Sequence, residues 1–138
     1  MNKIYEDLTI VTVLYDSSEL INDLLKNLMN FKVIVVDNGN NEQILKKLSN
    51  LKNVKVITQK KNLGYGRAIN FAFEKIKSKY FFVLNPDLVI SEKSINDLYT
   101  LITKNPGAGI VAPITQPDKD FYGLFPEKNT KKNLCQMI

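Results

Sequence analysis

Residues 8–14 read LTIVTVL, an unbroken run of aliphatic and β-branched side chains. A strand with one solvent-exposed face alternates polar and apolar residues, whereas a strand covered on both faces is apolar throughout. The run therefore predicts an interior strand of a sheet that helices cover on both sides. The polar residues Asp16 to Glu19 follow it and are typical of a helix start.

The alternation of apolar run and helical pattern continues along the chain. Further strands are predicted at residues 32–36, 54–58, 80–84 and 109–113. Aliphatic residues at helical spacing predict helices between them, at 20–28, 44–51, 68–76 and from Ser91 to Pro106. The third of these helices carries its apolar stripe on Ala68, Ile69, Ala72, Phe73 and Ile76. This order is typical of the α/β class, with a mainly parallel sheet sandwiched by helices.

Length and composition restrict the class of protein. With 138 residues, 44% apolar and 24% charged, the chain predicts one soluble globular domain. No apolar run approaches the roughly 18 residues of a membrane span, and the start lacks a signal-peptide pattern. The single cysteine, Cys135, cannot form an internal disulfide, which favours a reducing, cytoplasmic setting. The absence of histidine excludes histidine-based acid–base catalysis and histidine-ligated zinc.

The net charge of +5 favours an anionic partner, either a nucleotide, a nucleic acid or an acidic membrane face. The alternative is a solvated, lysine-rich surface. The lysines are dispersed and lack interleaved aromatic residues, so no nucleic-acid platform is predicted.

Polar residues follow each of the first four predicted strands. They are Asp16, Asp37 and Asn38, Asn62 to Arg67, and Asn85 and Asp87. In a parallel sheet these positions share the carboxyl edge, where α/β proteins bind their ligands. Three aspartates at one edge repel each other unless a cation lies between them. Asp and Asn oxygens suit Mg²⁺ or Mn²⁺, especially when a diphosphate supplies further oxygens.

Structural interpretations of the same positions remain open at this point. Asp16 fits a helix cap, and both Asp37-Asn38-Gly39 and Asn85-Pro86-Asp87 are ordinary turn sequences. Arg67 would reach a phosphate or face solvent. Tyr15 would stack on a base or cover the core.

A glycine-rich turn, Gly64-Tyr65-Gly66, precedes the third predicted helix. The glycines also fit a backbone requirement alone, and Tyr65 would stack on a base or cover the core. The turn is not a dinucleotide-binding fingerprint, because it follows the third strand and Ile69 replaces the last small residue. A P-loop and a Gly-x-Ser-x-Gly elbow are both absent from the sequence. A nucleotidyltransferase would need a glycine-rich, lysine-bearing loop after the first strand, which is also absent.

Taken in order, five segments resemble glycosyltransferase family 2. They are the strand at 8–15, VVDNGN (35–40), NLGYGRAIN (62–70), LNPD (84–87) and GIVAP (109–113). The resemblance covers roughly residues 8 to 126 and is to the nucleotide-sugar-binding half of the GT-A fold, which is Rossmann-like. It is nearest to the branch with rhamnosyl- and galactofuranosyltransferase-like members, in which Asn-Pro-Asp replaces the usual Asp-x-Asp.

The resemblance implies roles for particular residues. The loop at 14–16 would lie against the base and ribose, and Asp37 would accept a hydrogen bond from a uracil or thymine ring N–H. Asp87 matches the aspartate that binds Mg²⁺ or Mn²⁺. Asn85, at the first position of that motif, would weaken metal binding, or contact the sugar or a metal-bound water. The full predicted nucleotide-binding set is Leu14, Tyr15, Asp16, Asp37, Asn38, Asn62, Gly64, Arg67, Asn70 and Asn85.

The implied reaction is a metal-assisted, inverting transfer in polysaccharide biosynthesis, from a UDP- or dTDP-sugar to a glycan or lipid-linked acceptor. Family members carry an acceptor half and a general base after the metal motif. Residues 1–126 would form the donor-binding domain, and 127–138 a tail truncated before that half. The remaining acids, Asp118, Asp120 and Glu127, lie in no recognisable base motif, so no catalytic residue is assigned.

The alternative is a non-catalytic module that binds a nucleotide-sugar, or a donor half that needs a partner chain or self-association. The expected partners are the donor and the acceptor, without nucleic acid. The expected location is cytoplasmic, and the resemblance allows peripheral contact with the inner membrane face.

Overall fold

The computed structural model describes residues 2–15 and 20–113. The chain divides into two compact units, residues 1–96 and 97–138, and each is described by itself. The first unit contains the sheet. The predicted helix cap at Asp16 lies outside the described residues.

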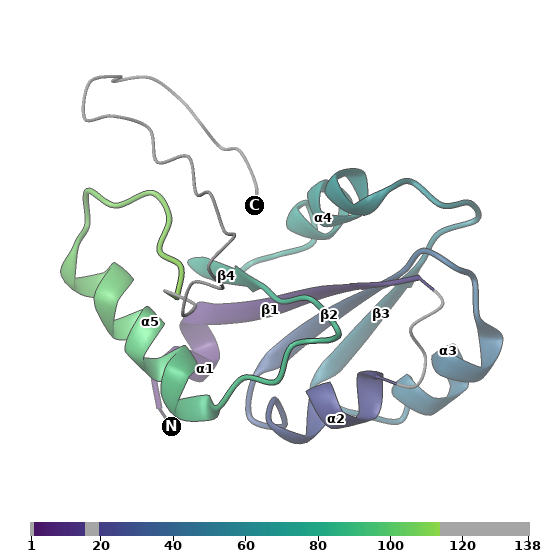
Figure 1. Ribbon diagram of the computed structural model, residues 1–138, viewed down its shortest axis with the longest axis horizontal. Helices are drawn as coiled ribbons and strands as arrows, with labels where there is room; N and C mark the ends of the chain where they lie inside the picture. Colours follow the sequence, from purple (N-terminus) through teal and green to yellow (C-terminus); the bar gives the residue numbers. More distant parts are fainter. Residues whose placement is uncertain (1, 16–19, 114–138) are drawn as a thin grey trace, which may run out of the picture. The chain divides into compact units, whose positions relative to one another are not determined.

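The first unit is built on a four-stranded sheet in which each strand is parallel to its neighbours (Figure 1). The strands are β1 (Leu8–Leu14), β2 (Lys32–Asp37), β3 (Val54–Thr58) and β4 (Tyr80–Val83), and their spatial order is β3-β2-β1-β4. All seven residues of β1 are buried, as the apolar run predicted. The α/β class with a parallel sheet is therefore confirmed.

The described helices are α1 (Ile4–Asp7), α2 (Ile21–Lys26), α3 (Glu42–Leu48), α4 (Tyr65–Phe73) and α5 (Glu92–Lys104). The four predicted helices correspond to α2 to α5, whereas α1 is a single turn too short for the sequence pattern to indicate. Ser91 caps α5, since its Oγ accepts a hydrogen bond from the Ser94 backbone N–H at 3.1 Å. The Tyr5 hydroxyl donates to Glu92 in the first turn of α5, which anchors that turn to α1.

The two faces of the sheet are covered by different helices (Figure 1). Val11 and Val13 of β1, with Ile34 and Val36 of β2, form one buried cluster with α4. Residues alternate in direction along a strand, so Ile10, Leu14, Val33 and Val35 are buried on the opposite face. Helices α2 and α3 lie on that side, as right-handed crossovers in a single direction along the sheet require.

Phe73 was predicted for the buried stripe of α4, and this prediction is wrong. Its side chain is 57% exposed, whereas Ala68, Ile69 and Ala72 are buried. Phe73 is the last residue of α4, and its ring packs on that of Phe81 in β4, with 5.4 Å between centroids. Because β4 is an edge strand of the sheet, no further strand of the described residues covers this aromatic pair.

The predicted fifth strand, residues 109–113, is also wrong. These residues belong to the second unit, whose described part is residues 97–113, and they form no strand. A strand requires a neighbour with which to exchange backbone hydrogen bonds, and that part of the chain offers none. Ile110 is accordingly 64% exposed.

No helix of the described residues is long and apolar enough to span a membrane.

The chain changes direction across the sheet at β1. From β1 it moves outward through β2 to β3, and it then returns over the opposite face through α4 to β4, on the other side of β1. The carboxyl ends of β1 and β4 therefore lie side by side at the point where the strand order reverses. Such a switch point opens a crevice, which is where α/β folds of this kind bind ligands.

Candidate functional site

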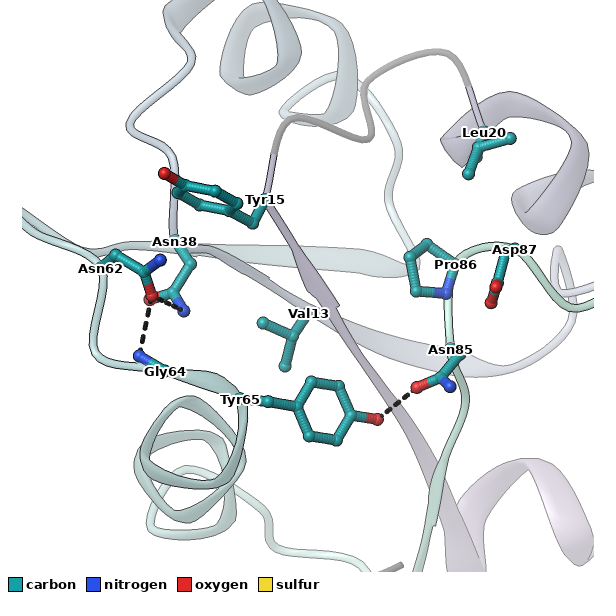
Figure 2. Close-up of a pocket in the computed structure, with 10 residues that line it drawn as sticks. All are labelled: Val13, Tyr15, Leu20, Asn38, Asn62, Gly64, Tyr65, Asn85, Pro86 and Asp87. Atoms are coloured by element: carbon teal, nitrogen blue, oxygen red, sulfur yellow. Dashed lines mark hydrogen bonds between the residues drawn. The ribbon is translucent and has the colours of Figure 1, made fainter.

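A pocket of about 390 Å³ lies at this switch point, at the carboxyl edge of the sheet (Figure 2). The loops after all four strands contribute to its wall, and the β1 strand itself contributes Val13. Its lining residues are Val13, Tyr15, Leu20, Asn38, Asn62, Gly64, Tyr65, Asn85, Pro86 and Asp87. Polar loops that are separate in the sequence thus meet around one cavity, as the strand endings predicted.

Asn38 connects two of these loops. Its side chain is only 3% exposed, so its amide must find partners within the protein. The Nδ2 donates to the Asn62 Oδ1 at 3.0 Å, and the Oδ1 accepts from the Leu63 backbone N–H at 3.2 Å. The Asn62 Oδ1 also accepts from the Gly64 backbone N–H at 2.7 Å. The β2 end and the turn before α4 are therefore held as one polar wall.

Gly64 has a backbone conformation that side chains exclude. Its φ of 76° and ψ of 160° fall in a region used almost only by glycine. The turn therefore needs glycine at position 64 for its own geometry, as the structural interpretation proposed. The same conformation directs the Gly64 N–H toward the Asn62 side chain and lets Tyr65 begin α4.

Replacing Gly64 with alanine is expected to lower the free energy of unfolding by about 1–3 kcal/mol, as measured by urea denaturation. A Cβ at this position would meet no atom within 4 Å, so the cost comes from backbone strain alone. Gly107→Ala is the matched control, because its Cβ also meets nothing within 4 Å and its φ is not positive. Its effect should stay below about 0.5 kcal/mol. Equal losses in the two variants would contradict the strain explanation.

Asp37 is buried, with 1% exposure, and does not line the pocket. Its Oδ1 accepts a hydrogen bond from the Gly39 backbone N–H at 3.0 Å, and its Oδ2 accepts one from the Asn41 N–H at 2.9 Å. It lies opposite Leu14 in the β1–β2 ladder, on the face of the sheet away from α4. Both carboxylate oxygens therefore stabilise the turn after β2.

The loop after β4 brings Asn85, Pro86 and Asp87 to the opposite wall. Asn85 and Asp87 are exposed, and the Tyr65 hydroxyl donates to the Asn85 Oδ1 at 2.6 Å. Burial raises the pKa of the Tyr65 phenol, and the negative charge of Asp87 raises it further. The phenol is thus protonated at neutral pH and available as a hydrogen-bond donor.

The other predicted site residues do not all line the pocket. Tyr15 lines the pocket and is 54% exposed, whereas Leu14 is buried within β1. Arg67 and Asn70 lie exposed on α4 and are not among the lining residues. Asp16, which completes the predicted loop, lies outside the described residues.

Val13, Leu20 and Pro86 line the pocket but were not predicted as site residues. Val13 and Leu20 belong to apolar patterns that indicate only core positions, and the proline had been assigned only to a turn. The sequence predicts that Tyr65 stacks on a base or covers the core, and it does not indicate the hydrogen bond to Asn85. One sequence signal does place Tyr65 near the site. It stands at the start of a predicted helix, directly after the loop that ends a predicted strand.

The oxygen ligands of the pocket are fewer than predicted. Of the residues that the structure describes, Asp87 is the only carboxylate that lines the pocket, since both Asp37 oxygens accept from the turn after β2. The described residues contain no group of three or more Asp, Glu, Cys or His residues that could hold a metal ion. Mg²⁺ in nucleotide sites commonly uses only one or two carboxylates, with phosphate oxygens and waters completing its shell. With one carboxylate, the described lining could hold such a cation only together with a diphosphate.

A parallel sheet with a polar crevice at its switch point is the arrangement in which α/β domains bind their ligands. The chain belongs to glycosyl transferase family 2, whose family model matches residues 9–136. The parallel sheet flanked by helices agrees with the GT-A, Rossmann-like half-domain that the sequence resemblance implied.

Particular relatives agree with this assignment. The chain is 29% identical to a teichoic acid poly(glycerol phosphate) polymerase of Staphylococcus epidermidis, over 83% of this chain and 16% of the relative. It is 29% identical to the low-salt glycan biosynthesis hexosyltransferase Agl10 of Haloferax volcanii, over 78% of this chain and 36% of the relative. It is 23% identical to an uncharacterized glycosyltransferase of Haemophilus influenzae, over 70% and 33% respectively. The matched region spans between about a sixth and about a third of these relatives.

Proposed function

We propose that this chain is the donor-binding half of a glycosyltransferase that uses a UDP- or dTDP-sugar. The observation that carries the proposal is the meeting of loops from four parallel strands around one polar pocket at the switch point. Membership of glycosyl transferase family 2 supports the transfer of a sugar. One relative is named as a hexosyltransferase of glycan biosynthesis, which supports a hexose as the sugar and a glycan as the acceptor. Rhamnose as the sugar and a lipid-linked acceptor are proposed from the sequence resemblance alone.

In this proposal, the pocket holds the nucleotide along the wall formed by Asn38 and the turn from Asn62 to Gly64. Tyr15 lines the pocket and is about half exposed, and in this proposal the base stacks on its ring. Asp87 holds Mg²⁺ or Mn²⁺ together with the diphosphate. The cation, when bound, stabilises the charge of the departing nucleoside diphosphate.

The proposed transfer is inverting. The acceptor hydroxyl oxygen forms a bond to the anomeric carbon from the side opposite the diphosphate. The bond from that carbon to the diphosphate oxygen breaks, and the nucleoside diphosphate leaves with the electron pair. The hydroxyl proton passes to a general base, which must lie within about 3 Å of the hydroxyl. Among the described lining residues Asp87 is the only carboxylate, and its role is the cation, so the base is assigned to another part of the enzyme.

The described lining of the pocket offers no carboxylate for this base besides Asp87, which favours one alternative. In it, the chain is a donor-binding half that binds nucleotide-sugar but transfers the sugar only with a further segment or partner chain. The share of each relative that this chain matches, from 16% to 36%, agrees with that alternative. Nucleotide binding without sugar turnover by the 138-residue chain would support it.

Calorimetric titration of the chain with UDP, dTDP and ADP in the presence of Mg²⁺ tests the donor class. We expect UDP or dTDP to bind in the range usual for substrates, about 1 μM to 1 mM. ADP should bind at least about tenfold more weakly, because adenine lacks the imide N–H whose hydrogen bond to Asp37 the family resemblance implies. No binding of either pyrimidine nucleotide, or equal binding of ADP, would contradict the proposal.

A further inference from the structure

We propose that Tyr65 is a positioning residue, which fixes the Asn85 amide so that its Nδ2 donates a hydrogen bond to the diphosphate of the bound donor. The inference rests on the proposed function, because it takes a nucleoside diphosphate as the ligand. It gives Asn85 the role of an anion-binding donor, and it leaves the cation to Asp87.

The hydrogen bond between Tyr65 and Asn85 connects two loops that are far apart in the sequence. Tyr65 is the first residue of α4, whereas Asn85 lies in the loop after β4, on the other side of the pocket. Figure 2 shows the phenol reaching across to the amide, and the hydroxyl oxygen lies 2.6 Å from the Asn85 Oδ1. This is a short hydrogen bond in an exposed part of the pocket, where water would otherwise compete for both groups.

The direction of this hydrogen bond decides what Asn85 offers to a ligand. A primary amide has an acceptor oxygen and two N–H donors, and the hydroxyl of Tyr65 occupies the oxygen. Among the described residues, none accepts a hydrogen bond from the Asn85 Nδ2, so the donor end is available. Diphosphate oxygens are acceptors only, and an amide turned by 180° would present its own oxygen to them. A phenol hydroxyl can also accept a hydrogen bond, but it is the stronger donor, because its oxygen lone pair is delocalised into the ring. Tyr65 therefore favours the orientation with Oδ1 toward its hydroxyl, which leaves Nδ2 to attract an anion.

The place of Asn85 in the loop makes the diphosphate the partner of this donor. Asn85 lies two residues before Asp87, and both line the same wall of the pocket. A diphosphate whose cation is held by Asp87 therefore comes close to the Asn85 amide. A carboxylate in place of Asn85 would repel that diphosphate unless a further cation intervened.

A double-mutant cycle with Tyr65→Phe and Asn85→Ala tests the coupling between the two residues. UDP and uridine are titrated with Mg²⁺ present, because uridine has the base and ribose but no diphosphate. Each single variant should bind UDP about three- to tenfold more weakly, which is the usual size of one lost hydrogen bond. Tyr65→Phe should have no further effect in the Asn85→Ala background, and uridine affinity should change in none of the variants.

Tyr5→Phe is the matched control, since it removes a tyrosine hydroxyl that donates to Glu92 and does not line the pocket. It should leave UDP affinity unchanged. Equal effects of Tyr65→Phe in both backgrounds would overturn the inference, because Tyr65 would then act independently of Asn85. An equal loss of uridine and UDP affinity would also overturn it, because Tyr65 would then contact the nucleoside.

The side-chain amide resonances of Asn85, assigned by their loss in Asn85→Ala, read the orientation without any ligand. Tyr65→Phe should shift these resonances in the free protein, and unchanged resonances would overturn the inference. If the wild-type chain binds no UDP, the proposed donor class fails. The resonance shift would then still support the positioning of Asn85 by Tyr65, so the two failures are distinguishable.

Discussion

Replacing Asp87 with alanine is expected to abolish the dependence of UDP or dTDP binding on Mg²⁺ or Mn²⁺. In the wild-type chain, a cation should strengthen nucleotide binding by about tenfold or more, because it neutralises charge shared by the diphosphate and Asp87. Within the described part of the chain, Asp87 supplies the only carboxylate that lines the pocket. Its removal should therefore leave the affinities with metal and with a chelator equal within about twofold. Calorimetric titration under both conditions measures this ratio.

Asp23→Ala is the control for this experiment. Asp23 is an exposed aspartate of α2 that pairs with Lys26 and does not line the pocket. This variant should keep the full cation dependence of the wild-type chain. If Asp87→Ala kept it as well, Asp87 would have no part in metal binding.

Asp37→Asn is expected to cost about 2–3 kcal/mol of the free energy of unfolding. The buried carboxylate accepts two backbone hydrogen bonds, and hydrogen bonds to charged groups contribute about 1.5–3 kcal/mol each. Asparagine can replace only one acceptor, because its NH₂ group then faces the second backbone N–H. Urea denaturation measures the loss. Asp23→Asn, at an exposed surface pair, should change the free energy by less than about 1 kcal/mol.

The Asp37→Asn variant also separates a structural role from a role in nucleotide recognition. UDP affinity is measured at a temperature where the variant is fully folded. A loss of affinity there would support the imide contact that the family resemblance implies for Asp37. Unchanged stability would show that the two backbone hydrogen bonds do not hold the turn after β2.

The sheet could be predicted because its strands follow a simple physical rule. A strand buried on both faces favours aliphatic and β-branched residues at successive positions, and LTIVTVL has that pattern. The same rule failed for GIVAP, because the apolar character of residues 109–113 does not supply a neighbouring strand. The prediction that Phe73 is buried failed for a related reason. Helical spacing indicates an apolar stripe along the helix, but it does not show where the sheet below the helix ends.

The convergence of polar loops could be predicted, but the direction of the side chains could not. Parallel strands bring Asn38, Asn62 and Asp87 to one edge whatever their exact geometry, and the structure places all three in one pocket. Whether Asp37 faces that pocket depends on alternation along β2 and on the backbone N–H groups of the following turn. The roles of these residues in binding a nucleotide stay predictions.

The pairing of β1 with β4 joins the two most distant strands of the first unit, with Leu8 opposite Tyr80, whereas β1, β2 and β3 pair with sequence neighbours. Closing so long a segment of chain is entropically costly until the intervening residues are ordered. The β1-β2-β3 layer can therefore assemble early, during synthesis as well as refolding. The loop with Asn85 and Asp87 reaches the pocket only when β4 pairs with β1. The pocket is therefore completed in the last step of this assembly, and only then can it bind a ligand.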